Sequence, residues 1–196
     1  MKGILFKEPL FHKVIDGKKT QTRQIMKPQP SFKYNGKSEI VVCELSENCC
    51  YNSDLDKIIS PRFKVGEKVF LKEPYSFGFE DECVYKFSSE KIANFEWENK
   101  LFMPEKYARY FIEITGVRCE RLQDISYEHC LKEGIVRSWN NDEWYNLINR
   151  PYEYFNGYVT CEHAEDAYAD LIDRINGKGT WKRNPFVWVY DFKLLK

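Results

Sequence analysis

The segment from Asp16 to Arg23 concentrates the residue types that do chemistry, with two hydroxyls, one amide and three cations within six residues. Gly17 precedes these side chains, and glycine is expected at a helix C-terminus because it adopts a left-handed backbone without a Cβ clash. The polar run therefore begins at a fixed point of the fold. Such a cluster could bind an anion, activate a hydroxyl nucleophile, or be a solvated turn between two elements.

Composition and charge favour a folded protein with a small anionic partner. The 196 residues are enough for one domain, and 43% hydrophobic and 16% aromatic residues exclude a disordered tail. Residues 1–37 hold nine Lys or Arg against two acids, whereas residues 120–175 hold five against twelve. A protein that wraps long nucleic acid shows a clear basic excess. We therefore expect local phosphate contacts, with a nucleotide or a short single strand rather than extended duplex DNA.

The seven cysteines form an odd set, and the N-terminus shows no secretory signal pattern. These features predict a reducing, cytoplasmic location without a disulfide framework. Cys43, Cys49 and Cys50 lack the spacing of a zinc knuckle, so neither a metal nor another cofactor is expected. No apolar run approaches the ~20 residues that span a bilayer, so no membrane partner is expected.

Periodicity predicts strands around a few helices. Expected strands cover residues 3–7, 40–44, 68–71, 83–87, 107–117 and 186–194, with a bulge at Gly116 in the fifth. Helices are expected from Pro9 to Gly17, over 127–133, around Trp144 to Ile148, and over 164–175. Ser126 should cap the second helix, and Gly134 should close it.

These elements predict an α+β fold, a small mixed β-barrel flanked by helices. The whole chain, 1–196, is expected to form a single domain with insertions near 28–60 and 76–106.

Five motifs resemble a known family. They are Gly-Lys-Lys-Thr-Gln-Thr-Arg at 17–23, Val-Gly-Glu at 65–67, Leu-Gln-Asp-Ile-Ser at 122–126, Glu-Gly-Ile at 133–135 and Asn-Pro-Phe-Val-Trp-Val at 184–189. Their order and spacing resemble the ASCH domain superfamily, and most closely its larger bacterial and phage-encoded branch. The resemblance runs from residue 3 to 194 and implies a PUA-like barrel with RNA or a modified nucleoside in a cleft beside it.

Some small ASCH proteins are N4-acetylcytidine amidohydrolases, and their catalytic lysine, threonine and glutamate correspond to Lys19, Thr22 and Glu133. The resemblance implies that Thr22 is the nucleophile, Lys19 its base and Glu133 a proton-handling or orienting group. Arg23 departs from that pattern, because the small amidohydrolases have an apolar residue after the threonine.

The residues themselves set two requirements for this chemistry. A threonine hydroxyl needs a neighbouring base, and lysine serves as one only if burial or nearby cations such as Lys18 and Arg23 lower its pKa. A carboxylate close to Lys19 would raise the pKa of the lysine instead. In a regular strand Lys19 and Thr22 would point to opposite faces, so a turn or bulge is required between them.

Further side chains are candidate ligand contacts, each with a structural alternative. Lys18, Gln21 and Arg23 could contact phosphate or a base, whereas solvated residues or ion pairs are the alternatives. Glu73 stands at a strand end, Trp181 could stack on a nucleobase, and Asn184 lies beside it before the last strand.

Three functions remain open at this point. The first is binding of RNA or a modified nucleoside. The second is deacylation of an N4-acylated cytidine through Lys19, Thr22 and Glu133. The third is a protein-interaction module that uses the acidic helical third of the chain.

Overall fold

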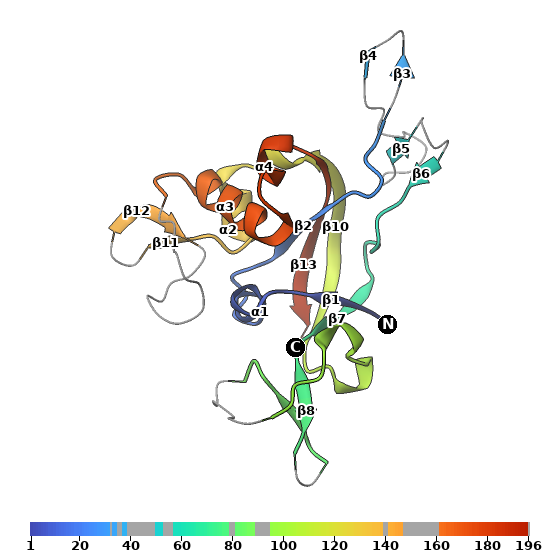
Figure 1. Cartoon of the computed structure of the whole chain (residues 1–196), viewed down its shortest axis with the longest axis vertical. Helices are drawn as coiled ribbons and strands as arrows, with labels where there is room; N and C mark the ends of the chain where they lie inside the picture. Colours follow the sequence, from blue (N-terminus) through green and yellow to red (C-terminus); the bar gives the residue numbers. More distant parts are fainter. Residues whose placement is uncertain are drawn as a thin grey trace.

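A five-stranded mixed sheet forms the framework of the protein (Figure 1). This computed structural model describes residues 1–31, 33–34, 37–38, 50–52, 57–78, 81–88, 95–138, 141–146 and 161–195. The strand order is β1-β7-β10-β13-β2. The strands are β1 (Lys2–Leu5), β2 (Gln21–Ile25), β7 (Lys68–Lys72), β10 (Phe111–Arg121) and β13 (Phe186–Leu195).

The long strands β10 and β13 run antiparallel through the sheet, from Phe111 paired with Leu195 to Arg121 paired with Phe186. Their register shifts between Ile114 and Gly116, which confirms the predicted bulge. β1 and β7 pair in parallel, and β2 pairs antiparallel with β13 at the opposite edge. The α+β class is therefore confirmed. The described strands form an open sheet with β1 and β2 at its edges, so they do not show a closed barrel.

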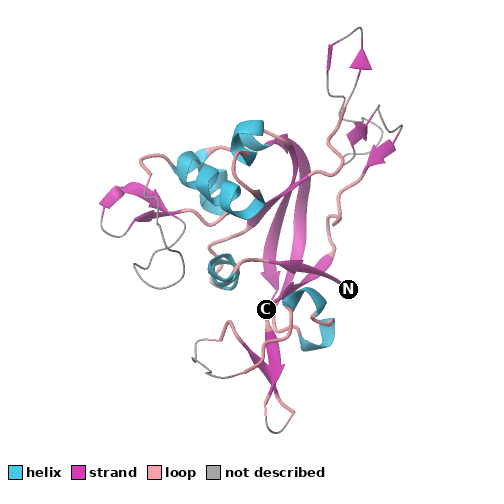
Figure 2. Ribbon diagram, viewed as in Figure 1, coloured by secondary structure: helices cyan, strands magenta, loops and turns pink. Residues whose placement is uncertain are grey.

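The helices flank this sheet (Figure 2). α1 (Glu8–Ile15) follows β1, and α2 (Tyr127–Lys132), α3 (Ala164–Asn176) and α4 (Thr180–Arg183) lie together near one end of β10 and β13. The short helices η1 (Lys100–Phe102), η2 (Glu105–Tyr107) and η3 (Leu122–Asp124) complete the helical segments. α3 confirms the predicted helix, because Ala164, Ala167, Tyr168, Leu171 and Ile172 form its buried face.

In the described part of the chain, four two-stranded ribbons lie outside the main sheet. They are β3–β4 (Lys33–Tyr34, Lys37–Ser38), β5–β6 (Cys50–Asn52, Lys57–Ile59), β8–β9 (Tyr75–Phe77, Cys83–Tyr85) and β11–β12 (Val136–Ser138, Asn141–Asn146). The helix predicted around Trp144 is wrong over its described part, because Trp144 lies in β12, which pairs with β11. The strand predicted over 40–44 lies outside the described residues, as do 147 and 148.

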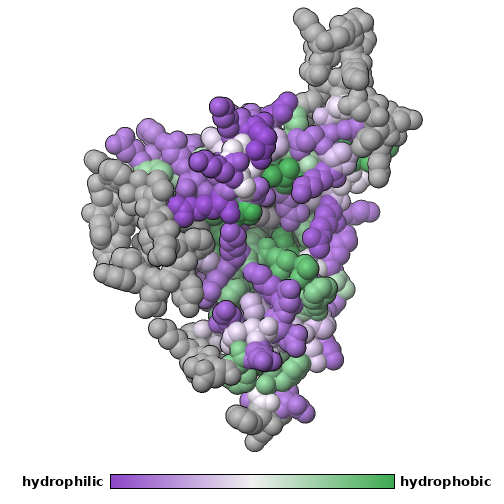
Figure 3. All heavy atoms as spheres, viewed as in Figure 1, coloured by the Kyte–Doolittle hydropathy of each residue, from purple (hydrophilic) through white to green (hydrophobic). Residues whose placement is uncertain are grey.

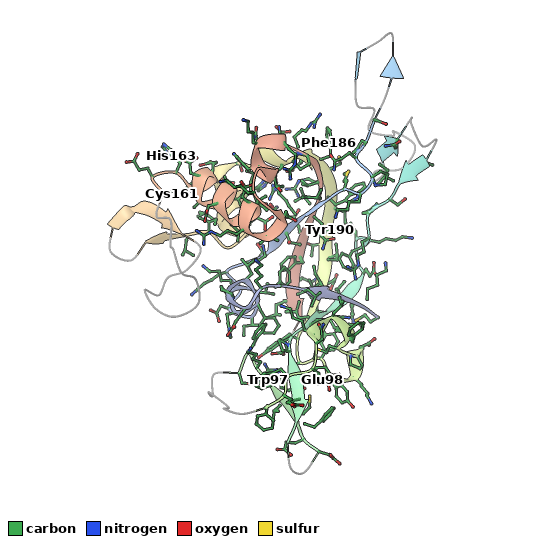
Figure 4. All side chains as sticks on the ribbon, viewed as in Figure 1. Trp97, Glu98, Cys161, His163, Phe186 and Tyr190 are labelled. Atoms are coloured by element: carbon green, nitrogen blue, oxygen red, sulfur yellow. The ribbon has the colours of Figure 1, made fainter. Side chains whose placement is uncertain are left out.

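One hydrophobic core joins the sheet to α1, α2 and α3. Phe11, Tyr168 and Tyr190 are completely buried in it. Phe186 and Tyr190 belong to the same strand, β13 (Figure 4). On the face shown in Figure 3, hydrophobic side chains gather toward the middle, with hydrophilic ones around them. This core fixes the positions of the turn after α1 and the end of α2, which carry the candidate site.

Candidate functional site

The turn after α1 places Lys19 outside a regular strand. Gly17 has a φ of 70°, in the left-handed region that favours glycine. The backbone N–H groups of Lys18 and Lys19 then both donate to the Lys13 carbonyl, at 2.8 and 2.9 Å. Because β2 begins only at Gln21, the alternation of strand faces does not apply to Lys19. The turn lies at residues 16–17, before Lys19, and the structure shows no turn or bulge at residues 19–22, where the sequence analysis required one.

Glu133 is positioned by the end of α2. The Ser126 hydroxyl accepts from the His129 N–H at the start of this helix, and Gly134 ends it with a φ of 100°, as the sequence predicted. The Thr20 N–H donates to the Lys132 carbonyl at 2.9 Å, which ties the start of β2 to the helix end. The residue after Lys132 is therefore held beside the turn that carries Lys19.

Lys19 and Glu133 form a buried ion pair. The Lys19 Nζ donates to Glu133 Oε2 at 2.5 Å, to the Glu133 carbonyl at 2.9 Å and to the Gln21 carbonyl at 2.7 Å. The two side chains are 1% and 5% exposed. Three acceptors match the three protons of an ammonium group, so this geometry corresponds to protonated Lys19.

Burial and neighbouring charges act on Lys19 in opposite directions. Burial lowers the pKa of the Lys19 amine below its ordinary value, and the nearby Arg23 cation lowers it further. The Glu133 carboxylate raises it, but burial is the larger effect. A buried amine with a lowered pKa beside a carboxylate is a candidate for proton transfer.

Arg23 is the second cation on Glu133 and is held by its own ring of contacts. Arg23 Nη1 donates to Glu133 Oε1 at 3.1 Å and to Gln21 Oε1 at 2.5 Å, and Nη2 donates to Glu120 Oε2 at 3.0 Å. The Gln21 amide donates to Asp191 Oδ1 at 2.6 Å, and Arg118 bonds both Asp191 and Glu120. This closed ring fixes the guanidinium and occupies both ends of the Gln21 amide.

Thr22 lines the same cleft as Lys19, Arg23 and Glu133. The cleft has a volume of about 370 Å³, within the size range of small-molecule sites. Its walls come from both edge strands of the sheet, from residues 4–7 around β1 and from 22–25 and 27 around β2, and from α3. The structure thus brings Lys19, Thr22 and Arg23 of the early polar segment to one hollow with the Glu133 carboxylate, whereas Gln21 is not among the lining residues.

The backbone of β2 adds hydrogen-bonding groups to this cleft. Met26 N–H donates to the Phe186 carbonyl, and Phe192 N–H donates to the Thr20 carbonyl. Alternation along an antiparallel ladder then turns the N–H and C=O groups of Arg23 and Ile25 away from β13, toward the free edge. Both residues line the cleft. The backbone N–H and C=O groups of Arg23 and Ile25 therefore present alternating donors and acceptors to a planar ligand in the cleft.

The other predicted contacts lie elsewhere. Lys18 is exposed, with its Nζ 3.8 Å from Asp16 Oδ2. Glu73 is fully buried and accepts two hydrogen bonds from the Arg109 guanidinium, at 2.9 and 2.7 Å. Trp181 packs against Tyr168, and Asn184 Oδ1 accepts from the Gln123 N–H at 2.8 Å. None of the four is among the residues that line this cleft.

The sequence analysis missed several cleft residues. Tyr168 lies in the helix predicted over 164–175 and is buried, but it also lines the cleft, and within the described residues its hydroxyl makes no hydrogen bond of good geometry. Lys7, Lys27 and Lys100 line the cleft from three different segments. The apolar periodicity over 164–175 predicted the helix that contains Tyr168, and its spacing places Tyr168 on the buried face. No local pattern joins the three lysines, since only the fold brings them together.

Comparison with protein-family models, with curated proteins and with solved structures found no match for this chain. Within the described ranges, no group of three or more His, Cys, Asp or Glu side chains is arranged to hold a metal ion. The same part of the chain contains no helix with the length and apolar character to cross a membrane.

Proposed function

We propose that the protein is an amidohydrolase that removes an acyl group from the exocyclic amine of an N4-acylated cytidine. The observation that carries this proposal is the Lys19–Glu133 ion pair inside a cleft that Thr22 also lines. The sequence resemblance to ASCH domains supports the same assignment. A PUA-like barrel is part of the proposal, supported by the two edge strands that line one cleft.

The reaction uses the three groups in sequence. Lys19 passes a proton to Glu133, and the neutral amine then takes the proton of the Thr22 hydroxyl as Oγ1 attacks the acyl carbon. The bond between that carbon and N4 breaks, Lys19 returns a proton to N4, and the acyl group remains on Thr22 as an ester. Water attacks this ester, which releases the carboxylic acid and restores the hydroxyl.

Two features of the cleft suit a nucleobase as the flat part of the ligand. The free edge of β2 offers backbone donors and acceptors at Arg23 and Ile25, which can pair with the polar edge of a base. The Nε of Arg23 and the hydroxyl of Tyr168 are buried neighbours, and within the described residues neither makes a hydrogen bond of good geometry. A ligand carbonyl or hydroxyl would satisfy both groups.

A second candidate is binding of RNA or a modified nucleoside without reaction. The three acceptors around Lys19 Nζ favour the ammonium form, which binds anions and carbonyl oxygens but is not a base. In this alternative the Lys19–Glu133 pair shapes the cleft, and Thr22 contacts the ligand.

Incubation with N4-acetylcytidine, followed by chromatography, separates the two candidates. The amidohydrolase forms cytidine and acetate in equal amounts. N-acetyl-lysine serves as the control for unspecific deacylation and should remain intact. Binding of N4-acetylcytidine without cytidine formation would contradict the enzymatic proposal and leave the binding function.

A further inference from the structure

The cleft carries an uneven charge. Among the described residues, five cations line it against the one carboxylate of Glu133; the cations are Lys7, Lys19, Arg23, Lys27 and Lys100. The whole chain has a formal net charge of zero, so this excess is local. Lys19 and Arg23 are neutralised by ion pairs with Glu133 and Glu120. The excess therefore comes from the three remaining lysines.

These three lysines come from separate segments. Lys7 follows β1, Lys27 follows β2, and Lys100 begins η1. Lys100 Nζ donates to the Phe6 carbonyl at 3.2 Å, next to Lys7, and Lys7 Nζ donates to the Arg174 carbonyl at 3.2 Å. Within the described residues none of the three forms an ion pair, and each ammonium that bonds one carbonyl has two further protons to donate.

The electrostatic surroundings of Lys100 agree with an anion site. Burial lowers the pKa of Lys100, and the cations Lys7 and Lys86 lower it further, whereas Glu8 raises it. Lys7 and Lys86 repel the Lys100 ammonium, and an anion bound near Lys100 would offset that repulsion.

A second observation points independently to a ligand in this cleft. Tyr168 is completely buried beside Arg23, and within the described residues neither its hydroxyl nor the Arg23 Nε makes a hydrogen bond of good geometry. An unsatisfied buried polar group is costly, so native proteins rarely keep one without a reason. Both residues line the cleft that the three lysines line. The cleft therefore suits a ligand with a polar group for Arg23 and Tyr168 and an anionic group for the lysines.

We propose that the cleft binds a nucleotide and that Lys7, Lys27 and Lys100 hold its phosphate. The nucleoside part of this ligand rests on the proposed function, whereas the phosphate part rests on the lysines. Three ammonium groups match the double negative charge of a terminal phosphate better than the single charge of a phosphodiester. A nucleoside monophosphate is thus the preferred ligand.

Calorimetric titration with cytidine and cytidine 5′-monophosphate at low salt tests this inference. The monophosphate should bind about tenfold more tightly than cytidine, and the difference should shrink as salt is added. The triple variant Lys7→Gln, Lys27→Gln, Lys100→Gln should lose that difference and keep its affinity for cytidine. Lys64→Gln, at an exposed lysine outside the cleft, is the matched control and should change neither affinity.

Equal affinities of the intact protein for cytidine and its monophosphate, or no binding of either, would overturn the inference. A tetracytidylate without terminal phosphates distinguishes a nucleotide phosphate from an RNA backbone. If it also binds more tightly than cytidine, and the triple variant loses that difference, the lysine site is supported and its ligand is an RNA backbone. These titrations use no acylated substrate. Tighter binding of the monophosphate without deacylation would therefore support the phosphate site and contradict the amidohydrolase proposal. Deacylation without tighter binding of the monophosphate would support the amidohydrolase proposal and contradict the phosphate site.

Discussion

Lys19 Nζ lies 2.5 Å from Glu133 Oε2, although the two residues are 114 positions apart in the sequence. Both side chains are almost fully buried, and Arg23 contacts the other carboxylate oxygen at 3.1 Å. Separating such a pair leaves a buried charge without a partner, which is strongly destabilising. The contact therefore ties the turn after α1 to the end of α2 and places a proton-carrying pair in the cleft.

Glu133→Gln tests the proton role of this pair. The carboxylate raises the pKa of Lys19, so its removal should lower that pKa further and move the acidic limb of the pH–rate profile to lower pH. The maximal rate should fall about 10²–10⁴-fold, as is typical for the loss of a general acid–base group. The measurement is kcat for N4-acetylcytidine against pH. If the acidic limb of the pH–rate profile stays at the same pH in Glu133→Gln, Glu133 does not influence the reacting proton.

Gly134→Ala should displace Glu133 through the backbone. Gly134 has a φ of 100°, and a Cβ there would lie 3.1 Å from the Lys13 Cδ. We expect a loss of about 1–3 kcal/mol in the free energy of unfolding, because the left-handed backbone is strained for alanine. Urea denaturation measures it. Gly17→Ala is the matched control, since Gly17 also has a positive φ but no atom near the added Cβ. Equal losses in the two variants would exclude a contribution from the Lys13 contact.

Lys13 predicts a dependence of stability on pH. Its side chain is buried, and burial lowers its pKa to about 8, with Lys18 adding to the shift. The unfolded chain then binds the proton more tightly than the folded protein between that pKa and the ordinary value. Stability should therefore rise with pH from about 8 to 10.5. Lys13→Met should be more stable than the parent at pH 7, and the difference should shrink toward pH 10. A difference that is constant with pH would contradict this explanation.

Tyr168→Phe should separate stability from binding. Within the described residues the buried hydroxyl of Tyr168 makes no hydrogen bond of good geometry, so its removal should raise the free energy of unfolding by about 1 kcal/mol. The affinity for the nucleotide should fall, since the ligand loses a hydrogen bond. Tyr190→Phe is the control and should lower the free energy of unfolding, because the Tyr190 hydroxyl accepts a hydrogen bond from the Arg62 N–H at 3.0 Å. Thermal unfolding and calorimetric titration of both variants check the pair. A destabilised Tyr168→Phe would show that the hydroxyl is satisfied.

The sequence predicted those parts of the fold that depend on neighbouring residues. The left-handed Gly17, the Ser126 cap and the buried face of α3 are local signals, and the structure contains each of them. Trp144 was assigned to a helix because the spacing of a few apolar residues cannot separate a short helix from a strand. Trp144 lies in a strand because β12 pairs with β11, a contact that the spacing of apolar residues does not reveal.

The site was predictable only in part, for the same reason. Lys19, Thr22 and Arg23 belong to one short segment, so the sequence found them together. Their partners Glu120 and Asp191 come from β10 and β13, and only the sheet register brings them close. Lys100 lies in the insertion expected near 76–106, for which the sequence predicted no site residue. No spacing along the chain links it to Lys7.

Cytidine release from N4-acetylcytidine by the parent protein, by Thr22→Ala and by Thr20→Ala tests the central claim most directly. Thr20 is the matched control, a hydroxyl two residues away that is not among the residues lining the cleft. We predict that Thr22→Ala abolishes cytidine release, whereas Thr20→Ala retains it within about twofold of the parent. Equal release by the parent and Thr22→Ala would contradict the hydroxyl mechanism and with it the assigned roles of Lys19 and Glu133.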